Sequence, residues 1–508
     1  MKILFSVSHF GFLRNFEPAL RRLAASGHRI HLLADRRDTL GGTKTIDNLL
    51  ATHPEAFTYG YAPTRKSDPF HQLAVRLRQC LDYWRYLGPR YDQARSLRVR
   101  ASTQAPPIAS RVARWPVIGS VPGMALLGAL VRRVERALPY GRGPLQILDE
   151  HKPDVLLVTP LLYFGSVQVD YVRAARDRGI PVCHCVGSWD HLTTKGVIHE
   201  IPDRLTVWNE AQRREAAEIH GVPPDRVMVT GAQAYDHWFT QQPSTTREAF
   251  CAMVGLPEGR PFVLYLCSSP FITPHEVPFI RTWLAALRAS SDVRVRTAGV
   301  LIRPHPQNAE QWRDVDLRDV EAVAIWPRAG ANPVDTDARA VYFDSMFHAV
   351  AVVGVNTSAQ IESGIVGRPV CAIQTADFAG TQEGTLHFQH LKSVNGGLLH
   401  LASDLSTHVA QLGEILAAPE VFAARSRAFI EAFVRPHGLT QPAAEPFVRA
   451  IESLVDVKPH PRPRTMTDRL ITWAAAPVAA AVDRAAALQK ARKKASAGGP
   501  AADERERG

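Results

Sequence analysis

A glutamate lies within a largely apolar segment, VGVNTSAQIESGIVGRPVCAI, at residues 353–373. A strand-like run ends at Gly354, and Thr357 and Ser358 can cap a helix that begins near Ser358. Glu362 follows four residues later, one turn along the same helix face. Its carboxylate can accept hydrogen bonds from both hydroxyls of a ribose, and the hydroxyls and N–H groups before it can hold a phosphate. The alternative is that Thr357 and Ser358 only cap the helix and that Glu362 is a surface residue.

A second polar group follows the apolar run in VLIRPHPQN, residues 300–308. Arg303 and His305 come directly after a predicted buried strand. An arginine guanidinium offers a fork of donors that matches phosphate oxygens. The segment therefore predicts a phosphate contact, although a proline-stiffened loop with a surface histidine would have the same composition.

A third polar group is the loop VGSWDHLTTKG, residues 186–196, which follows another predicted strand. It brings together Trp189, Asp190, His191 and Lys195. Asp190 or His191 is a candidate general base that could deprotonate an acceptor hydroxyl. The alternative is an Asx turn beside a packed tryptophan.

The elements that must position these residues alternate between strands and helices, which predicts parallel sheets covered by helices. Strands are expected at 2–8, 29–35, 154–160, 179–187, 204–209 and 226–231, and then at 262–268, 299–304, 320–326, 340–344, 349–354 and 368–374. Helices are expected at 16–28, 166–179, 210–221, 276–290 and 358–367, with two more near 404–432 and 441–455. The pattern restarts near residue 240, so we expect two doubly wound domains with the ligand between them, at the carboxyl ends of the strands.

The positive charge of the chain is concentrated in two segments. Residues 65–142 hold 15 Lys/Arg against 4 Asp/Glu, and residues 458–508 hold 11 against 5, whereas the whole chain carries +11. The rest of the chain is therefore acidic, which argues against a general nucleic-acid binder and for two basic appendages. The insertion at 65–142 mixes aromatic, apolar and arginine residues. It can contact a membrane surface or form a helical subdomain with solvated arginines.

The rest of the composition predicts a cytoplasmic protein. The six cysteines are scattered, and the spacing of Cys183 and Cys185 does not match a zinc or redox site, so buried thiols are expected. The first residues carry no secretory signal. The chain has no uninterrupted run of 18 apolar residues, so we expect no membrane span. We expect a floppy, largely disordered tail or a loose basic helix after residue 457.

The order of these motifs resembles that of the GT-B glycosyltransferases. In that superfamily a Ser/Thr-rich loop precedes a helix whose glutamate binds the nucleotide ribose, with a Gly-x-Pro five residues later, and Glu362, Gly367 and Pro369 match this spacing. The chain is also similar to UDP-N-acetylglucosamine 2-epimerases and CDP-glycerol glycerophosphotransferases, in which an His-Pro pair like that at His305 helps to hold the donor diphosphate. The segment 11–28, GFLRNFEPALRRLAASGH, resembles the glycine loop and helix that open such transferases.

The resemblance implies further site residues. Phe12 stands where many members have a catalytic histidine, which leaves His9, three positions earlier, as another candidate base. Gly11, Trp189 and Lys195 would lie on the acceptor side. On the donor side, the resemblance adds Asn356, Gln382 and Glu383 to Arg303, His305, Thr357, Ser358 and Glu362. The family needs no cofactor, and we expect no bound metal.

The resemblance thus implies an α/β protein of two Rossmann-like domains that face each other across a cleft. The expected parts are an acceptor domain at 1–240 with the helical basic insertion at 65–142, a donor domain at 241–456 and a tail at 457–508. The implied reaction moves a sugar from a nucleotide-activated donor to a hydroxyl of a polysaccharide or lipid-linked acceptor, and the basic insertion suits an anionic inner membrane face. A CDP-glycerol-type glycerophosphotransferase, a sugar-nucleotide 2-epimerase and a non-catalytic binding scaffold remain alternatives.

Overall fold

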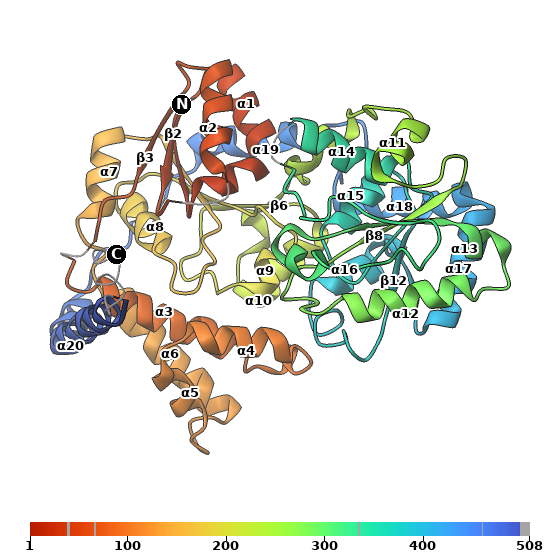
Figure 1. Ribbon diagram of the computed structural model, residues 1–508. Coiled ribbons are helices and arrows are strands. Elements are labelled where there is room, and N and C mark those ends of the chain that lie inside the picture. The colour runs from red at the N-terminus through yellow and green to blue at the C-terminus, as the bar shows by residue number, and fades with distance from the viewer. Residues whose placement is uncertain (38–40, 66–67, 334–335, 460, 498–508) are drawn as a thin grey trace, which may run out of the picture.

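Two parallel β-sheets, each covered by helices, lie side by side in the computed structural model (Figure 1). The structure describes residues 1–37, 41–65, 68–333, 336–459 and 461–497. The N-terminal sheet has the order β3-β2-β1-β4-β5-β6-β7, and the C-terminal sheet has the order β10-β9-β8-β11-β12-β13. In each sheet the order reverses direction next to the first strand, between β1 and β4 and between β8 and β11. Such switch points are where doubly wound sheets bind ligands.

The N-terminal sheet contains seven strands in the described part of the chain. Its strands are β1 (Lys2–Val7), β2 (Arg29–Ala34), β3 (Phe57–Tyr61), β4 (Val155–Thr159), β5 (Val182–Cys185), β6 (Arg204–Val207) and β7 (Val227–Val229). Its helices include the 3₁₀ turn η1 (Phe10–Asn15), α1 (Glu17–Ala25), α2 (Gly42–Thr52), α7 (Gly143–His151), α8 (Gln168–Asp177), α9 (His191–Thr194), α10 (Glu210–His220) and the turns η3 (Pro224–Arg226) and η4 (Gln233–Phe239). All six expected strands form, and β3 is an additional edge strand.

The C-terminal sheet differs from expectation at one strand. Its strands are β8 (Phe262–Leu266), β9 (Gly299–Arg303), β10 (Val323–Ile325), β11 (Ala351–Gly354), β12 (Val370–Ile373) and β13 (Leu399–Ala402). Its helices include α11 (Arg247–Val254), α12 (Val277–Arg288), α13 (Val293–Thr297), η5 (Pro306–Trp312), α14 (Thr336–Phe347), α15 (Ala359–Ile365), α16 (Phe388–Ser393), η6 (Val394–Gly396), α17 (Leu405–Ala417) and α18 (Pro419–Phe433). The expected strand at 340–344 was wrong, because these residues form the middle of α14, and β13 takes the sixth place in the sheet.

The chain returns to the N-terminal domain after α18. Helix α19 (Ala444–Glu452) and the turn η7 (Ser453–Asp456) pack against α1, and Phe447 lies 5.9 Å from the ring of Phe16. The crossing is fixed by Asp236, which accepts hydrogen bonds from the Arg435 guanidinium and from the N–H of Ala443, at 2.8 Å each. Helix α19, which the expected second domain at 241–456 includes, therefore packs on the N-terminal domain.

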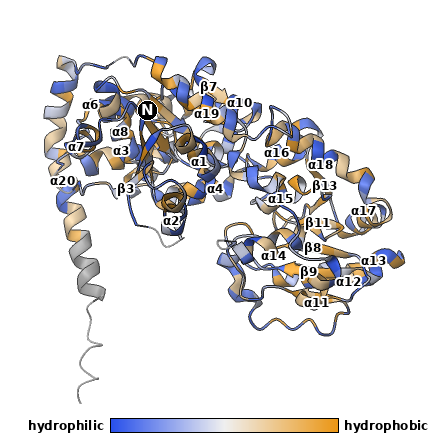
Figure 2. Ribbon diagram, turned by 90° about the horizontal axis from the view of Figure 1, so that it is seen from above, coloured by the Kyte–Doolittle hydropathy of each residue, from blue (hydrophilic) through white to orange (hydrophobic). Residues whose placement is uncertain are grey.

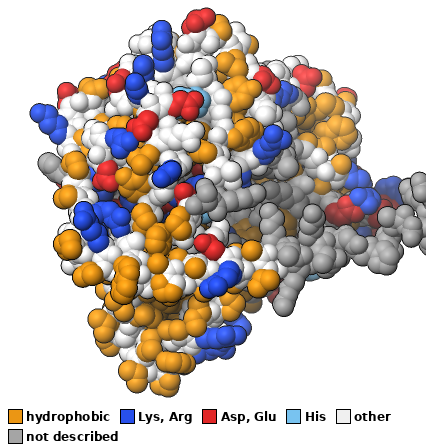
Figure 3. Space-filling view, turned by 90° about the vertical axis from the view of Figure 1, so that its left-hand side faces the viewer, with side chains coloured by type: hydrophobic (Ala, Val, Ile, Leu, Met, Phe, Trp, Pro, Cys, Tyr) orange, Lys and Arg blue, Asp and Glu red, His pale blue; other side chains and the backbone are white. Residues whose placement is uncertain are grey.

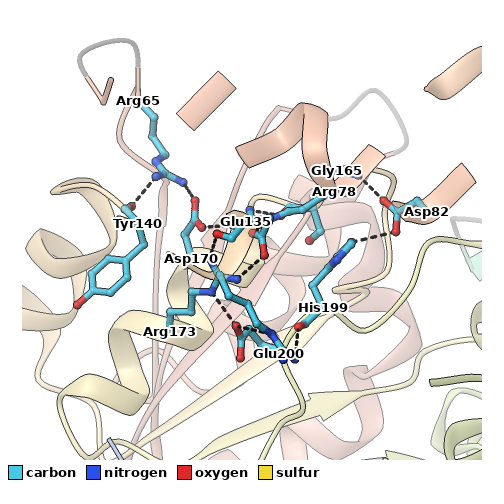
Figure 4. Close-up of polar contacts among 12 residues, drawn as sticks. Arg65, Arg78, Asp82, Glu135, Tyr140, Gly165, Asp170, Arg173, His199 and Glu200 are labelled. Carbon is cyan, nitrogen blue, oxygen red and sulfur yellow. Dashed lines mark hydrogen bonds and ion pairs between the residues drawn. The ribbon is translucent and has the colours of Figure 1, made fainter. Parts of the chain in front are cut away.

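The insertion at 65–142 forms a helical arm below the N-terminal sheet (Figure 1). It contains α3 (His71–Arg85), η2 (Pro89–Tyr91), α4 (Arg95–Gln104), α5 (Pro107–Ala113) and α6 (Val121–Ala137). The expectation that its arginines are all solvated does not hold for Arg78, which is fully buried and donates to Glu135 of α6 (2.6 Å) and to Asp170 of α8 (Figure 4). Burial alone would raise the pKa of Glu135, but Arg173 and Arg78 lower it to about 2. These buried ion pairs attach the arm to the sheet-covering helix α8.

The tail forms a long helix, α20 (Met466–Ala497), which matches the expected alternative of a helix and not that of a largely disordered segment. It runs along α6 at one edge of the molecule (Figure 2), and Ala475 and Ala479 are buried in a cluster with Leu73 and Leu138. Residues 498–508 lie outside the described residues. The stretch Met466–Leu488 is long and apolar enough to cross a membrane by length and composition. This stretch does not contain 18 apolar residues in a row, because charged residues near both of its ends interrupt the apolar sequence.

Candidate functional site

A cavity of about 740 Å³ lies between the two domains. Its N-terminal wall comes from η1 and from the loop after β5, and its C-terminal wall comes from the loops after β8, β9 and β11. The carboxyl edges of both sheets therefore meet at this cavity, as expected for doubly wound domains. Its lining includes Arg14, Asn15, Ser188, Trp189, Trp208, Tyr235, Arg303, His305, Tyr342, Thr357, Ser358 and Glu362.

Glu362 lines this cavity from α15. The side chain is only partly exposed, and the opening it faces is the cavity. The Tyr342 hydroxyl donates a hydrogen bond to Glu362 Oε2 at 2.5 Å. Burial raises the pKa of Glu362 to about 7, although the hydrogen bond from Tyr342 and the charges of Arg14 and Arg303 act to lower it. The carboxyl group is thus held at the cavity wall by one hydrogen bond and has a second oxygen that can accept from a ligand.

Arg303 ends β9 and is nearly completely buried beside Glu362. Its Cζ lies 4.8 Å from the centre of the Tyr342 ring, a cation–π distance. Its Nη1 has no hydrogen-bond partner within the described part of the chain. Burial lowers the pKa of this guanidinium to about 10, so it remains charged at neutral pH. A buried cation with an unused donor favours an anionic ligand in the cavity.

Three further residues that were predicted to contact the donor lie at the same wall of the cavity. His305 caps η5, where its Nδ1 accepts from the Gln307 N–H at 3.1 Å, and burial lowers its pKa. Thr357 and Ser358 begin α15, and Ser358 is exposed and makes no side-chain capping bond. The structure therefore places His305, Thr357, Ser358, Glu362 and Arg303 around one space.

Three predicted donor contacts do not line the cavity. Asn356 is buried and donates to the Thr381 carbonyl at 2.8 Å. Gln382 is also buried, and its amide donates to the carbonyl oxygens that follow β11 and end β12, at 3.0 and 3.1 Å. Glu383 pairs with Lys392 at 2.6 Å, on the outer side of the loop. These side chains hold the loop after β12 in place and lie away from the cavity lining.

The predicted base Asp190 is held by its own loop. Its carboxylate accepts from the Ser188 hydroxyl at 2.5 Å and the Thr194 hydroxyl at 2.8 Å, and Lys195 Nζ lies 3.8 Å away. Burial would raise the pKa of Asp190, but Lys195 and His191 hold it well below its usual range. A carboxylate that is so stable in its ionised form is a poor proton acceptor. Asp190 therefore matches the alternative of a turn-forming residue better than that of a base.

The two candidate histidines both pack against Phe12. The ring centre of His9 lies 4.7 Å from that of Phe12. The ring centre of His191, which follows β5, lies 6.0 Å from that of Phe12. Both histidines are buried, and burial lowers the pKa of His191 to about 4. Neither side chain belongs to the cavity lining, and Gly11 and Lys195 do not belong to it either, whereas Trp189 does. Phe12, which lies between the two histidines, is not part of the cavity lining either.

Several cavity-lining side chains were not predicted from the sequence, among them Tyr342, Tyr235 and Arg14. Tyr342 was assigned to a strand, and Tyr235 lies in η4 at the end of the N-terminal domain. Arg14 belongs to η1, directly after the first strand, and its charge acts on Glu362 from the opposite domain. A basic residue in the first loop of a doubly wound sheet is the signal that could have identified Arg14.

Comparison with known proteins finds similarity in structure alone. No protein-family model matches the chain, and no curated protein matches it. A Listeria monocytogenes protein described as a candidate UDP-N-acetylglucosamine 2-epimerase is 12% identical, with a TM-score of 0.51 over 91% of this chain and 98% of that one. UDP-GlcNAc 2-epimerase from Neisseria meningitidis is 13% identical, with a TM-score of 0.47 over 89% of this chain and 100% of that one. A Rickettsia africae glycosyltransferase is 9% identical, with a TM-score of 0.49 over 89% of this chain and 98% of that one. The chain has the GT-B fold, with two Rossmann-like domains that face each other across a cleft.

Proposed function

We propose that this protein is a glycosyltransferase that binds a nucleotide-activated sugar in the interdomain cavity and transfers the sugar to an acceptor hydroxyl. The observation that carries the proposal is the arrangement of Glu362, Tyr342 and Arg303 at the carboxyl edge of the C-terminal sheet. It offers a hydrogen-bond acceptor for ribose hydroxyls beside a buried cation with an unused donor. A nucleoside diphosphate presents the complementary groups, which are ribose hydroxyls and phosphate oxygens.

In this proposal the C-terminal domain holds the donor. Glu362 Oε1 accepts from the ribose, and Arg303 donates to the diphosphate, with Thr357, Ser358 and His305 at the same wall. These donors would stabilise the negative charge that develops on the leaving diphosphate. The N-terminal domain supplies the acceptor side through Trp189 and the loop around it. No cofactor takes part in this reaction.

The base would come from His191 or His9, which pack against the two sides of Phe12 in the N-terminal domain. The His191 ring is neutral at physiological pH, but a pKa of about 4 makes it a weak base, so His9 stands beside it as the second candidate. A sugar-nucleotide 2-epimerase would use the same ribose and diphosphate contacts, and the cavity fits it equally well. Only the transferase needs an acceptor hydroxyl, and only the epimerase must remove and return the hydrogen at the sugar C2.

The test is a thermal-shift panel of UDP-, CDP-, GDP- and CMP-linked donors, which includes CDP-glycerol, on the full chain. We expect one nucleotide class to raise the melting temperature, and Glu362→Ala to remove that shift. The selected donor is then incubated alone in D₂O and with candidate acceptors. Acceptor-dependent release of nucleotide supports a transferase, and exchange of the sugar C2 hydrogen without acceptor supports an epimerase. A folded protein that binds none of the donors would refute the proposal and favour a binding scaffold.

A further inference from the structure

The helical arm presents an apolar surface to solvent. On α6, Val121, Leu126 and Leu130 are 71%, 75% and 59% exposed, and Trp115 and Val117 in the preceding turn are 61% and 82% exposed. Figure 3 shows hydrophobic side chains covering the lower end of the molecule, with Lys and Arg side chains beside them. Scattered exposed apolar residues are ordinary, but a contiguous group of large ones marks an interaction surface.

Helix α20 adds a second exposed apolar stripe, because it is apolar on two opposite faces. Ala475 and Ala479 pack against the arm, while Met466, Leu470 and Trp473 are 69%, 63% and 79% exposed. These three residues are spaced by four and three positions, so they form one stripe opposite the packed face. A helix of a soluble protein normally turns a polar face outward. The outward face of α20 therefore lacks a partner within the described part of the chain.

An arginine-rich pocket of about 360 Å³ opens beside the first turn of α20. Arg142 has no hydrogen-bond or ion-pair partner for its guanidinium within the described ranges, and Arg136 Nε is buried without a hydrogen bond, 3.9 Å from Glu200. Acidic groups offset only part of this charge. The charged lining comprises Arg136, Arg142, Arg173, Arg176, Arg462, Arg464, Asp177, Glu200 and Asp468. Such a pocket suits a phosphate group.

We propose that α5, α6 and α20 form a docking surface for an anionic lipid bilayer, and that the arginine-rich pocket takes a lipid phosphate. The apolar side chains would enter the boundary between headgroups and acyl chains, and Trp473 would lie at that depth. The inference depends on the arm and the tail helix and does not rest on the proposed function.

The charges favour a lipid surface over a second copy of the chain. Between residues 93 and 148 the only acidic residue is Glu135, which is buried in the ion-pair cluster. The same helices and the turn after α5 carry the exposed arginines Arg111, Arg114, Arg132, Arg469 and Arg484. Two copies meeting through this surface would bring like charges together, whereas an anionic bilayer complements them.

The test is co-sedimentation of the full chain with vesicles of phosphatidylcholine alone or mixed with phosphatidylglycerol. We expect binding to the anionic vesicles that weakens as salt is raised. The combined variant Leu126→Ser, Leu130→Ser and Trp473→Ser should bind roughly 100-fold more weakly, because three large apolar side chains no longer enter the bilayer. The pair Arg142→Gln and Arg462→Gln should weaken binding to anionic vesicles roughly 10-fold and leave the weak binding to neutral vesicles unchanged.

Matched controls lie on the C-terminal domain, far from the arm. Val293→Ser with Val421→Ser removes two side chains that are 57% and 67% exposed, and Arg318→Gln removes an exposed arginine. These variants should bind vesicles as the wild type does, and all variants should melt at the wild-type temperature. The proposal is overturned if the wild type stays in the supernatant, or if the triple variant sediments like the controls. A dimer that dissociates in the triple variant, without vesicle binding, would also overturn it and identify a second copy as the partner.

Discussion

Replacing Glu362 by glutamine tests the ribose contact directly, because it keeps the shape of the side chain and removes its charge. Tyr342 already donates to Glu362 Oε2, and the proposed function assigns Oε1 as the acceptor for ribose hydroxyls. In the glutamine variant an NH₂ group takes the place of one of these oxygens, so at least one acceptor is lost. The ligand then loses a charge-assisted hydrogen bond while the cavity keeps its volume.

The size of the effect follows from the chemistry of that bond. A hydrogen bond to a charged group contributes about 1.5–3 kcal/mol, which corresponds to a roughly 10- to 150-fold loss of affinity. The substitution should not destabilise the folded protein. The pKa of Glu362 is raised from 4.5 to about 7, so its ionisation disfavours the folded state as the pH rises through this range. Above pH 7 the glutamine variant should therefore melt at the wild-type temperature or higher.

Isothermal titration measures this with the nucleoside diphosphate that the donor panel selects and with its 2′-deoxy counterpart. The wild type should prefer the ribonucleotide, and Glu362→Gln should bind both ligands with nearly equal, weak affinity. The reasoning fails if the variant binds the ribonucleotide as tightly as the wild type does. It also fails if the variant loses the same factor for both ligands, because the carboxylate would then act elsewhere than on the ribose.

Four other predictions follow from the same contacts. Nucleoside affinity should rise as the pH increases through about 7, because ribose hydroxyls donate best to the ionised Glu362, and titration of Glu362→Gln should show no such rise. Arg303→Gln should weaken binding of the diphosphate roughly 10- to 100-fold in calorimetry and leave the nucleoside unaffected; equal losses would place Arg303 away from the phosphates. His191→Ala should lower the turnover rate while donor affinity stays constant, and Asp190→Asn should lower it less; the reverse order would make Asp190 the base. Arg78→Ala should lower the free energy of unfolding by about 3–5 kcal/mol in denaturant titration, because two carboxylates stay buried with fewer partners, and a loss below about 1 kcal/mol would contradict that role.

The sequence predicted strands best where burial on both faces leaves a continuous apolar run. β4 and β8 are of this kind, and both were found. β3 was missed because it is an edge strand with exposed residues, and a short run between turns does not identify such a strand. The segment at 340–344 has strand-like composition, but α14 includes it because the helix continues on both sides. Local propensity decides little when the flanking residues favour another element.

The candidate site was predictable where it depends on residues close together in the sequence. Arg303 ends β9 and Glu362 lies in α15, the helix that follows β11, and the topology of doubly wound sheets then places both at one edge. Tyr342 reaches Glu362 from a helix twenty residues earlier, and Arg14 reaches the cavity from the other domain. No spacing rule links such residues, because their proximity arises from the packing of α14 and the closing of two domains. Asn356 and Gln382 show the converse, since polar residues near a cleft can serve the backbone instead.

Phe12 lies between the two histidines that are candidates for the base. The resemblance places a catalytic histidine at this position in many transferases, and this chain has an aromatic ring there with His9 on one side and His191 on the other. Both histidines come from loops at the carboxyl edge of the N-terminal sheet, after β1 and after β5. A base must reach the cavity to act on an acceptor. Phe12 lies between His9 and His191, the two rings that could serve as the base. Phe12→Ala should therefore change the acceptor side of the reaction, through the rate and its pH dependence, while donor affinity, which depends on the opposite domain, remains at the wild-type value.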